Sequence, residues 1–114
     1  MSSYKTGDVV NLRCPNEEDP TKSSYRPVII VEDLQDEILV VFITTQLKQQ
    51  SNYPNSFIIN KDSVAAQEMG LTSDSLICPN RTAQVRKVIV YPPARGTCPE
   101  EILDKLIDLV ENLK

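Results

Sequence analysis

The chain has no histidine and no tryptophan, and among its 114 residues there are only three cysteines. The lack of histidine excludes a Ser-His-Asp triad, a Cys-His pair and any His-ligated metal site. The cysteines, Cys14, Cys78 and Cys98, lie far apart and form no C-x-x-C pair, which argues against a disulfide framework and a zinc site. We therefore expect structural thiols, no metal site and no cofactor.

Long hydrophobic runs are absent as well. No apolar stretch approaches the roughly 20 residues that span a bilayer, and the polar segment Met1–Asp8 lacks the apolar region of a signal peptide. These absences predict a cytoplasmic protein that does not contact a membrane. A chain of 114 residues supports one hydrophobic core, so residues 1–114 are expected to form a single domain.

The charge balance is acidic, with 16 Asp and Glu against 12 Lys and Arg and a formal net charge of −4. A protein that binds nucleic acid usually carries a basic surface. Contact with RNA would therefore require positive side chains to gather at one place, because the local field governs association.

Most of the hydrophobic residues are Val, Ile and Leu, which favour β-strands. Short hydrophobic runs bounded by turn residues predict strands over residues 8–13, 26–32, 37–44, 57–59, 76–78 and 84–91. Two of these, 26–32 and 37–44, flank a tight turn and predict a central antiparallel hairpin. We expect polar loops over 14–24 and 45–55, and we expect the double proline at 92–93 to break the last ladder.

Two helices are predicted as well. Residues 61–69 favour a short helix, with Asp62 as its candidate N-cap and Gly70 as its stop. Residues 97–113 predict an amphipathic helix that begins with a Thr-x-x-Glu capping box. Its apolar stripe consists of Ile102, Leu103, Leu106, Ile107, Val110 and Leu113. The expected fold is mostly β: a small SH3-like antiparallel barrel with a C-terminal amphipathic helix.

Two polar residues bound the predicted hairpin at its open end. Arg26 begins one strand, Thr44 ends the other, and both are equally far in sequence from Gln35 in the turn. They should therefore be near cross-strand partners. A guanidinium beside a hydroxyl makes a good phosphate receptor. The alternative is a surface arginine paired with one of the carboxylates at residues 17–19.

At these residues the sequence resembles MazF/PemK-type toxins of bacterial toxin–antitoxin pairs. The similar segments, in order, are Gly7-Asp8-Val9-Val10, Arg26-Pro27-Val28-Ile29-Ile30-Val31, Ile43-Thr44-Thr45-Gln46, Gly70-Leu71, Asp74-Ser75, Arg81-Thr82 and the helix after Gly96. Each segment is short, but their order and spacing together are specific. The resemblance covers roughly Gly7 to Val110.

The resemblance implies a barrel of the CcdB/PemK type that forms a homodimer and is inhibited by a cognate antitoxin. It also implies a metal-independent endoribonuclease, in which the 2′-hydroxyl of single-stranded RNA attacks the neighbouring phosphate. The family's catalytic arginine and threonine fall on Arg26 and Thr44. The RNA-binding residues expected around them are Lys22, Ser24, Thr45, Gln46, Lys48 and Arg81.

The chain also departs from the family pattern. Some members carry an arginine and an aspartate near residues 76–78, or a histidine in the first loop, and this chain has neither. No general base is therefore assigned, although a carboxylate at residues 17–19 is a candidate. Two other functions stay open: a toxin of the same fold that acts on DNA gyrase, as CcdB-like members do, and an inactive binding module.

Overall fold

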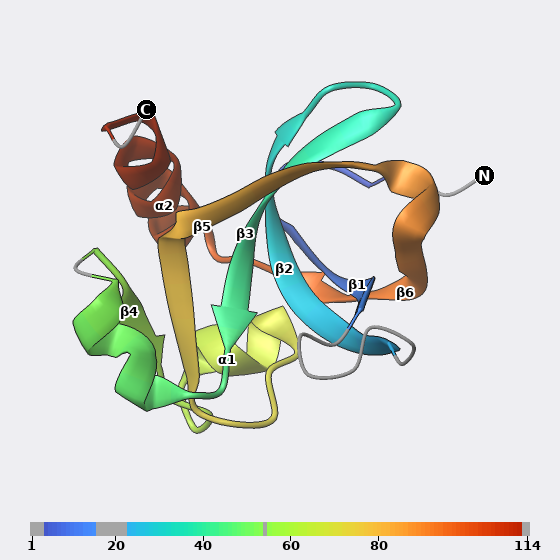
Figure 1. Cartoon of the computed structure of the whole chain (residues 1–114). Helices are drawn as coiled ribbons and strands as arrows, with labels where there is room; N and C mark the ends of the chain where they lie inside the picture. The colour runs from blue at the N-terminus through green and yellow to red at the C-terminus, as the bar shows by residue number, and fades with distance from the viewer. Residues whose placement is uncertain (1–3, 16–22, 54, 113–114) are drawn as a thin grey trace.

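The computed structural model describes residues 4–15, 23–53 and 55–112. Within them, six antiparallel strands form one strongly curled sheet, shown in Figure 1. The strands are β1 (Asp8–Pro15), β2 (Ser23–Asp33), β3 (Glu37–Thr44), β4 (Phe57–Ile59), β5 (Ser75–Arg86) and β6 (Val90–Thr97). Their order across the sheet is β4-β5-β3-β2-β1-β6, so the predicted β2–β3 hairpin lies at its centre. A curled, half-barrel sheet with a C-terminal helix confirms the predicted fold class.

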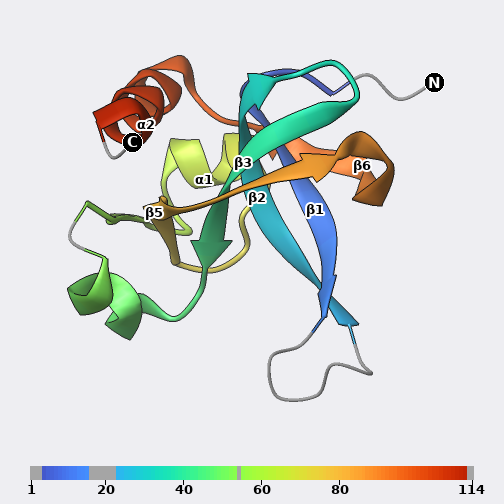
Figure 2. The same ribbon diagram turned by 45° about the horizontal axis from the view of Figure 1, so that its top comes forward.

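The two faces of the sheet bury separate hydrophobic clusters, because successive residues of a strand point to opposite faces. Helices α1 (Val64–Met69) and α2 (Glu100–Asn112) cover one face, here called the helix face, and lie to the same side in Figure 2. The opposite, barrel face lies inside the curl of the sheet. Its cluster consists of Tyr4, Val10, Leu12, Val28, Ile30, Ile38, Val40 and Val90. Each fully buried Val, Leu or Ile contributes about 1.5–3 kcal/mol, so both faces hold the fold together.

Helix α2 has the predicted amphipathic pattern. Leu106 and Val110 are buried in the helix-face cluster, and Ile102, Leu103 and Ile107 pack against it. Leu113 lies outside the described residues. The charged residues of the helix are all exposed: Glu100, Glu101, Asp104, Lys105, Asp108 and Glu111. No helix in the described part of the chain is long and apolar enough to cross a membrane.

The start of α2 differs from the prediction. Thr97 is not an N-cap, because it is the last residue of β6 and pairs with Asp8 of β1. The first helical hydrogen bond runs from the Leu103 N–H to the Pro99 carbonyl (2.9 Å). Thr97 therefore belongs to the sheet, although the local capping pattern would place it at the start of the helix.

Helix α1 also begins later than expected, at Val64 in place of residue 61. Its N-cap is Ser63, whose hydroxyl accepts a hydrogen bond from the Ala66 N–H (3.1 Å), and not Asp62. The reason is the preceding turn, in which the Ser63 N–H donates to the Asn60 carbonyl (3.0 Å) and leaves Ser63 beside the first turn of the helix. Gly70 ends the helix in the left-handed conformation (φ 72°), as predicted.

The strands are longer than the hydrophobic runs suggest. β1 extends to Pro15 and β2 begins at Ser23, so both ends of the loop predicted over 14–24 belong to strands, and residues 16–22 lie outside the description. Strand β5 joins the predicted strand 76–78 to the first part of the predicted strand 84–91. The rest of the second predicted strand is divided between a 3-10 helix, η2 (Lys87–Ile89), and the start of β6. The β1–β6 register shifts between Val9 and Asn11, opposite the double proline. A further 3-10 helix, η1 (Leu47–Asn52), lies within the predicted loop 45–55.

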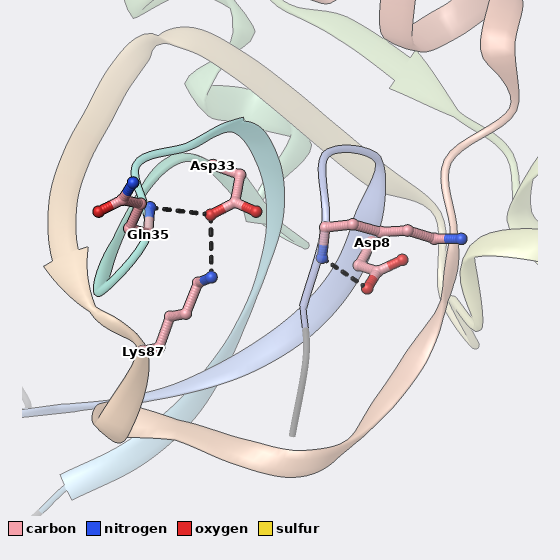
Figure 3. Close-up of polar contacts among 5 residues, drawn as sticks. Asp8, Asp33, Gln35 and Lys87 are labelled. Carbon is pink, nitrogen blue, oxygen red and sulfur yellow. Dashed lines mark hydrogen bonds and ion pairs between the residues drawn. The ribbon is translucent and has the colours of Figure 1, made fainter. Parts of the chain in front are cut away.

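The turn of the central hairpin is fixed to the β5–β6 corner (Figure 3). The Asp33 carboxylate accepts a hydrogen bond from the Gln35 N–H (3.1 Å) and forms an ion pair with Lys87 of η2 (2.9 Å). The Lys87 N–H also donates to the Asp36 carbonyl (3.0 Å). The hydrogen bond from Lys87 lowers the pKa of Asp33. Because Asp33 is exposed and Lys87 is only half-buried, this pair orients the turn more than it stabilises the fold.

Candidate functional site

The central hairpin has the register that equal spacing about Gln35 predicts. Val28 of β2 faces Phe42 of β3, and Ile30 faces Val40. Residues that face each other across antiparallel strands point to the same side of the sheet. Both pairs belong to the barrel face, on which Phe42 packs against the buried cluster.

Arg26 lies two residues before Val28 on β2, and Thr44 lies two residues after Phe42 on β3. At these positions the two strands no longer pair with each other. There Arg26 pairs with Leu12 of β1, and Thr44 pairs with Leu76 of β5. Alternation places both side chains on the barrel face. The sequence suggested that Arg26 begins its strand, but β2 starts earlier, at Ser23. We call the region around Arg26 and Thr44, at this end of the barrel face, the hairpin rim.

Thr44 is positioned by its own turn. Its hydroxyl oxygen accepts a hydrogen bond from the Gln46 N–H (3.2 Å). Because the oxygen serves as acceptor in this bond, the hydroxyl proton can be donated to a ligand. Thr45, Gln46 and Lys48 follow Thr44 and are exposed, so the polar residues predicted after Thr44 are accessible.

Arg26 is half-buried at the rim. Among the described residues, no carboxylate forms an ion pair with it. The carboxylates proposed as alternative partners, at residues 17–19, lie outside the description, as does Lys22. Ser24 lies in β2 opposite Cys14, and its side chain is not described.

Arg81 is brought to the same face by an irregularity in β5. Val41 pairs with Thr82, whereas the next residue, Phe42, pairs with Cys78, so three residues of β5 bulge out of the ladder. The Arg81 guanidinium carbon lies 5.6 Å from the centroid of the Phe42 ring. It also lies 5.9 Å from the centroid of the Tyr53 ring. Both distances are within the range of cation–π interactions.

The two cysteines whose side chains are described have the character of structural thiols. Cys78 and Cys98 are buried and free. Burial raises the pKa of Cys78, although the charge of Arg81 acts in the opposite direction. Burial raises the pKa of Cys98 to about 12. Neither thiol is therefore a thiolate near neutral pH, and neither is suited to act as a nucleophile.

Other surface features of the described residues lie away from the hairpin rim. One depression lies at the start of α2, between Lys5 and Glu68, and another lies at the hairpin turn, beside Arg86 and Lys87. Within the described ranges, no three His, Cys, Asp or Glu residues are placed to hold a metal ion together. At the rim, the guanidinium of Arg26 and the hydroxyl of Thr44 are groups suited to bind phosphate.

The family of the chain follows from a comparison with protein-family models. Residues 5–113 match the model of the PemK-like, MazF-like toxin of type II toxin–antitoxin systems. The chain belongs to this toxin family. The family match covers nearly the whole chain and confirms the resemblance seen in the sequence. A comparison with curated protein sequences gives no match.

Solved structures of MazF-like toxins share the fold. A MazE–MazF complex from Deinococcus radiodurans (Form-III) matches with a TM-score of 0.72 at 11% identity, covering 98% of this chain and 96% of that chain. Form-II of the same complex matches with a TM-score of 0.73 at 12% identity, covering 99% and 96%. An endoribonuclease in complex with its cognate antitoxin from Mycobacterial species matches with a TM-score of 0.68 at 12% identity, covering 97% and 94%.

The toxin fold gathers part of the predicted site and adds two residues to it. Arg26, Thr44 and Arg81 all lie on the barrel face, and Lys48 is exposed in η1, shortly after Thr44. Sequence reasoning missed Phe42 and Tyr53, which hold Arg81. Phe42 reads in the sequence as a core residue of a strand. Tyr53, an aromatic in an otherwise polar loop, was the one available signal.

Proposed function

We propose that this chain is a metal-independent endoribonuclease toxin that cleaves single-stranded mRNA in the cytoplasm. The observation that carries the proposal is the shared position of Arg26 and Thr44 on the barrel face, where the two central strands separate. These are also the residues on which the family's catalytic arginine and threonine fall. Family membership supports the same reading, because the matched model describes a toxin of a toxin–antitoxin system.

The proposed reaction is an internal transesterification. The 2′-oxygen of the RNA forms a bond to the adjacent phosphorus, while the bond from phosphorus to the 5′-oxygen breaks. The 2′-hydroxyl loses a proton and the departing 5′-oxygen gains one, which leaves a cyclic phosphate and a free 5′-hydroxyl. The nucleophile is already next to the phosphorus, so the protein has to orient the RNA and stabilise charge.

Arg26 and Thr44 have separate roles in this reaction. The guanidinium of Arg26 stabilises the charge that develops on the phosphate oxygens, as a planar fork of donors does well. The Thr44 hydroxyl accepts from Gln46 and donates its own proton to a non-bridging oxygen. Loss of one such donor typically lowers the rate about 100- to 1,000-fold.

The partners follow from the same proposal. The toxin acts as a homodimer, and a cognate antitoxin protein inhibits it. The inhibition by an antitoxin is supported by the solved neighbours, which are complexes of a toxin with its antitoxin. The exposed residues near the rim, Thr45, Gln46 and Lys48, would contact the RNA backbone together with Arg81, and Lys22 and Ser24 are proposed to do so from the preceding segment.

The test is cleavage of a long single-stranded RNA in EDTA, with mapping of the cleaved ends. We expect discrete cuts with the unchanged protein and a loss of at least about 100-fold in Arg26→Ala and Thr44→Ala. Arg86→Ala is the matched control, because Arg86 is exposed and pairs with Glu37 at the opposite end of the hairpin. Equal cleavage by the Arg26 and Arg86 variants, or no cleavage by the unchanged protein, would refute the proposal.

A further inference from the structure

The Arg81 side chain is held in a defined place by two aromatic rings from different parts of the fold. Phe42 belongs to β3, and Tyr53 is the first residue after the 3-10 helix η1. The guanidinium carbon lies within 6 Å of both ring centroids, at 5.6 Å and 5.9 Å. We call these three residues the aromatic–arginine platform.

The backbone around the platform is fixed on both sides. In β5 the bulge after Cys78 contains Pro79, which has no N–H to donate to the ladder, and Arg81 lies at its end. On the other side, the Tyr53 carbonyl accepts hydrogen bonds from the Ser56 N–H (2.9 Å) and the Ser56 hydroxyl. Ser56 is itself buried. The two elements that carry Arg81 and Tyr53 are therefore set before any ligand binds.

The platform borders the hairpin rim. Phe42 and Thr44 are two residues apart on one strand and point to the same face, which places them about 7 Å apart along the strand. Arg26 lies on the same face, two residues from Val28, the cross-strand partner of Phe42. A single RNA strand whose phosphate contacts Arg26 and Thr44 can therefore extend a neighbouring base over Tyr53 and Arg81.

The chemistry of the platform suits a nucleobase. Bases of single-stranded RNA stack on aromatic rings and on guanidinium planes. Cation–π contacts use the face of the Arg81 guanidinium and leave the N–H donors at its edge. Among the described residues, no hydrogen bond or ion pair uses these donors. Two adjacent guanidinium donors match the O6 and N7 acceptors of guanine.

We propose that Tyr53 and Arg81 form a base-binding subsite that selects guanine next to the scissile phosphate. Tyr53 stacks on the base, and Arg81 donates to O6 and N7. Phe42 contacts the Arg81 guanidinium through its ring and is a positioning residue. The inference rests on the proposed ribonuclease function, to which it adds the residues that determine sequence preference.

The test compares the cleavage kinetics and cleavage positions of four variants. We expect Tyr53→Leu and Arg81→Lys to raise KM about tenfold, the loss of one stacking or paired contact to a base, with kcat within about a factor of two to three. The guanine preference should weaken at one position near the cut. Tyr53→Phe retains the ring and should behave like the unchanged protein. Arg86→Lys is the matched control for Arg81→Lys, because it makes the same change at an exposed residue of β5.

A change in the RNA tests the subsite without altering the protein. Replacing guanine by 7-deazaguanine removes the N7 acceptor, and we expect this to raise KM with the unchanged protein but to have little further effect in Arg81→Lys. Unchanged KM and unchanged cleavage positions in Tyr53→Leu and Arg81→Lys would overturn the inference. So would an equal effect of 7-deazaguanine on both proteins.

Failure of the proposed function is distinguishable from failure of the subsite. If the unchanged protein cleaves no RNA, the ribonuclease proposal falls, and the subsite is judged by binding of a fluorescent single-stranded RNA that contains guanine. About tenfold weaker binding by Tyr53→Leu and Arg81→Lys would then support the subsite. No binding, or equal binding by all proteins, would overturn it.

Discussion

Replacing Gly96 by alanine should destabilise the protein, because β6 passes directly against the end of α1 at this residue. A Cβ atom at Gly96 would lie 2.2 Å from the Glu68 carbonyl oxygen and 2.7 Å from the Met69 carbonyl carbon. Both are backbone atoms, which cannot rotate away as the end of a side chain can. The Arg95 side chain holds the same junction by donating from Nε and Nη2 to the Gly70 carbonyl (3.2 and 2.9 Å).

The magnitude follows from two opposing effects. Overpacking a well-packed site costs typically 1–3 kcal/mol, and contact with backbone places this case near the upper end, at about 3 kcal/mol. Replacing glycine by alanine restricts the unfolded chain, which returns at most about 1 kcal/mol. The net loss is about 2 kcal/mol, which for a domain of this size lowers the midpoint of thermal unfolding by roughly 8 °C.

Thermal unfolding followed by circular dichroism measures this shift. Ala94→Ser, an exposed substitution on the same strand, serves as the control and should leave the midpoint within about 1 °C, as exposed substitutions usually do. A midpoint for Gly96→Ala within about 2 °C of the unchanged protein would show that the junction between β6 and α1 has room for a methyl group. The close packing argued from the backbone would then be wrong.

Two further predictions concern stability. Burial raises the pKa of Cys98 from 9.0 to about 12, so above pH 9 the unfolded chain loses a proton that the folded protein keeps, and stability should fall across this window. In urea unfolding at pH 8 to 11, the loss of stability with pH should be shallower in Cys98→Ala, and parallel pH profiles would contradict the assignment. Ser63→Ala removes the N-cap of α1 and should cost about 1 kcal/mol. Asp62→Ala, one residue earlier, should cost less than half as much in the same urea titration, and equal losses would mean that the cap is misassigned.

Hydrophobic runs predicted the central strands well because β2 and β3 are buried on both faces. Their register was also predictable, although for a reason that the sequence does not display. The Leu34 N–H donates to the Glu37 carbonyl, so the turn is centred between Gln35 and Asp36. A register shift in the β2–β3 pairing, between Ile30 and Glu32, then moves the centre of the pairing back to Gln35. Equal spacing therefore located Arg26 and Thr44 on one face, although the two strands separate before they pair there.

The remaining differences arise where tertiary contacts compete with local patterns. Thr97 has a good capping sequence, but strand pairing with Asp8 takes it into β6. Arg81 was predicted to contact RNA without any sign of how it is held. Its rings, Phe42 and Tyr53, come from segments that only the fold brings together. No local pattern predicts a bulge that carries an arginine onto an aromatic ring across the sheet.

The acidic surface of α2 makes the protein electrically asymmetric. The helix carries five carboxylates and one lysine, a charge of −4, which equals the formal net charge of the whole chain. The rest of the chain is therefore neutral in sum, and Arg26 and Arg81 lie on the face of the sheet opposite α2. This charge distribution is a dipole directed across the sheet. The field of a polyanion would therefore rotate the protein as well as act on its net charge. The protein would meet the RNA with α2 turned away from the RNA, so an acidic isoelectric point is compatible with capture of RNA at the opposite face.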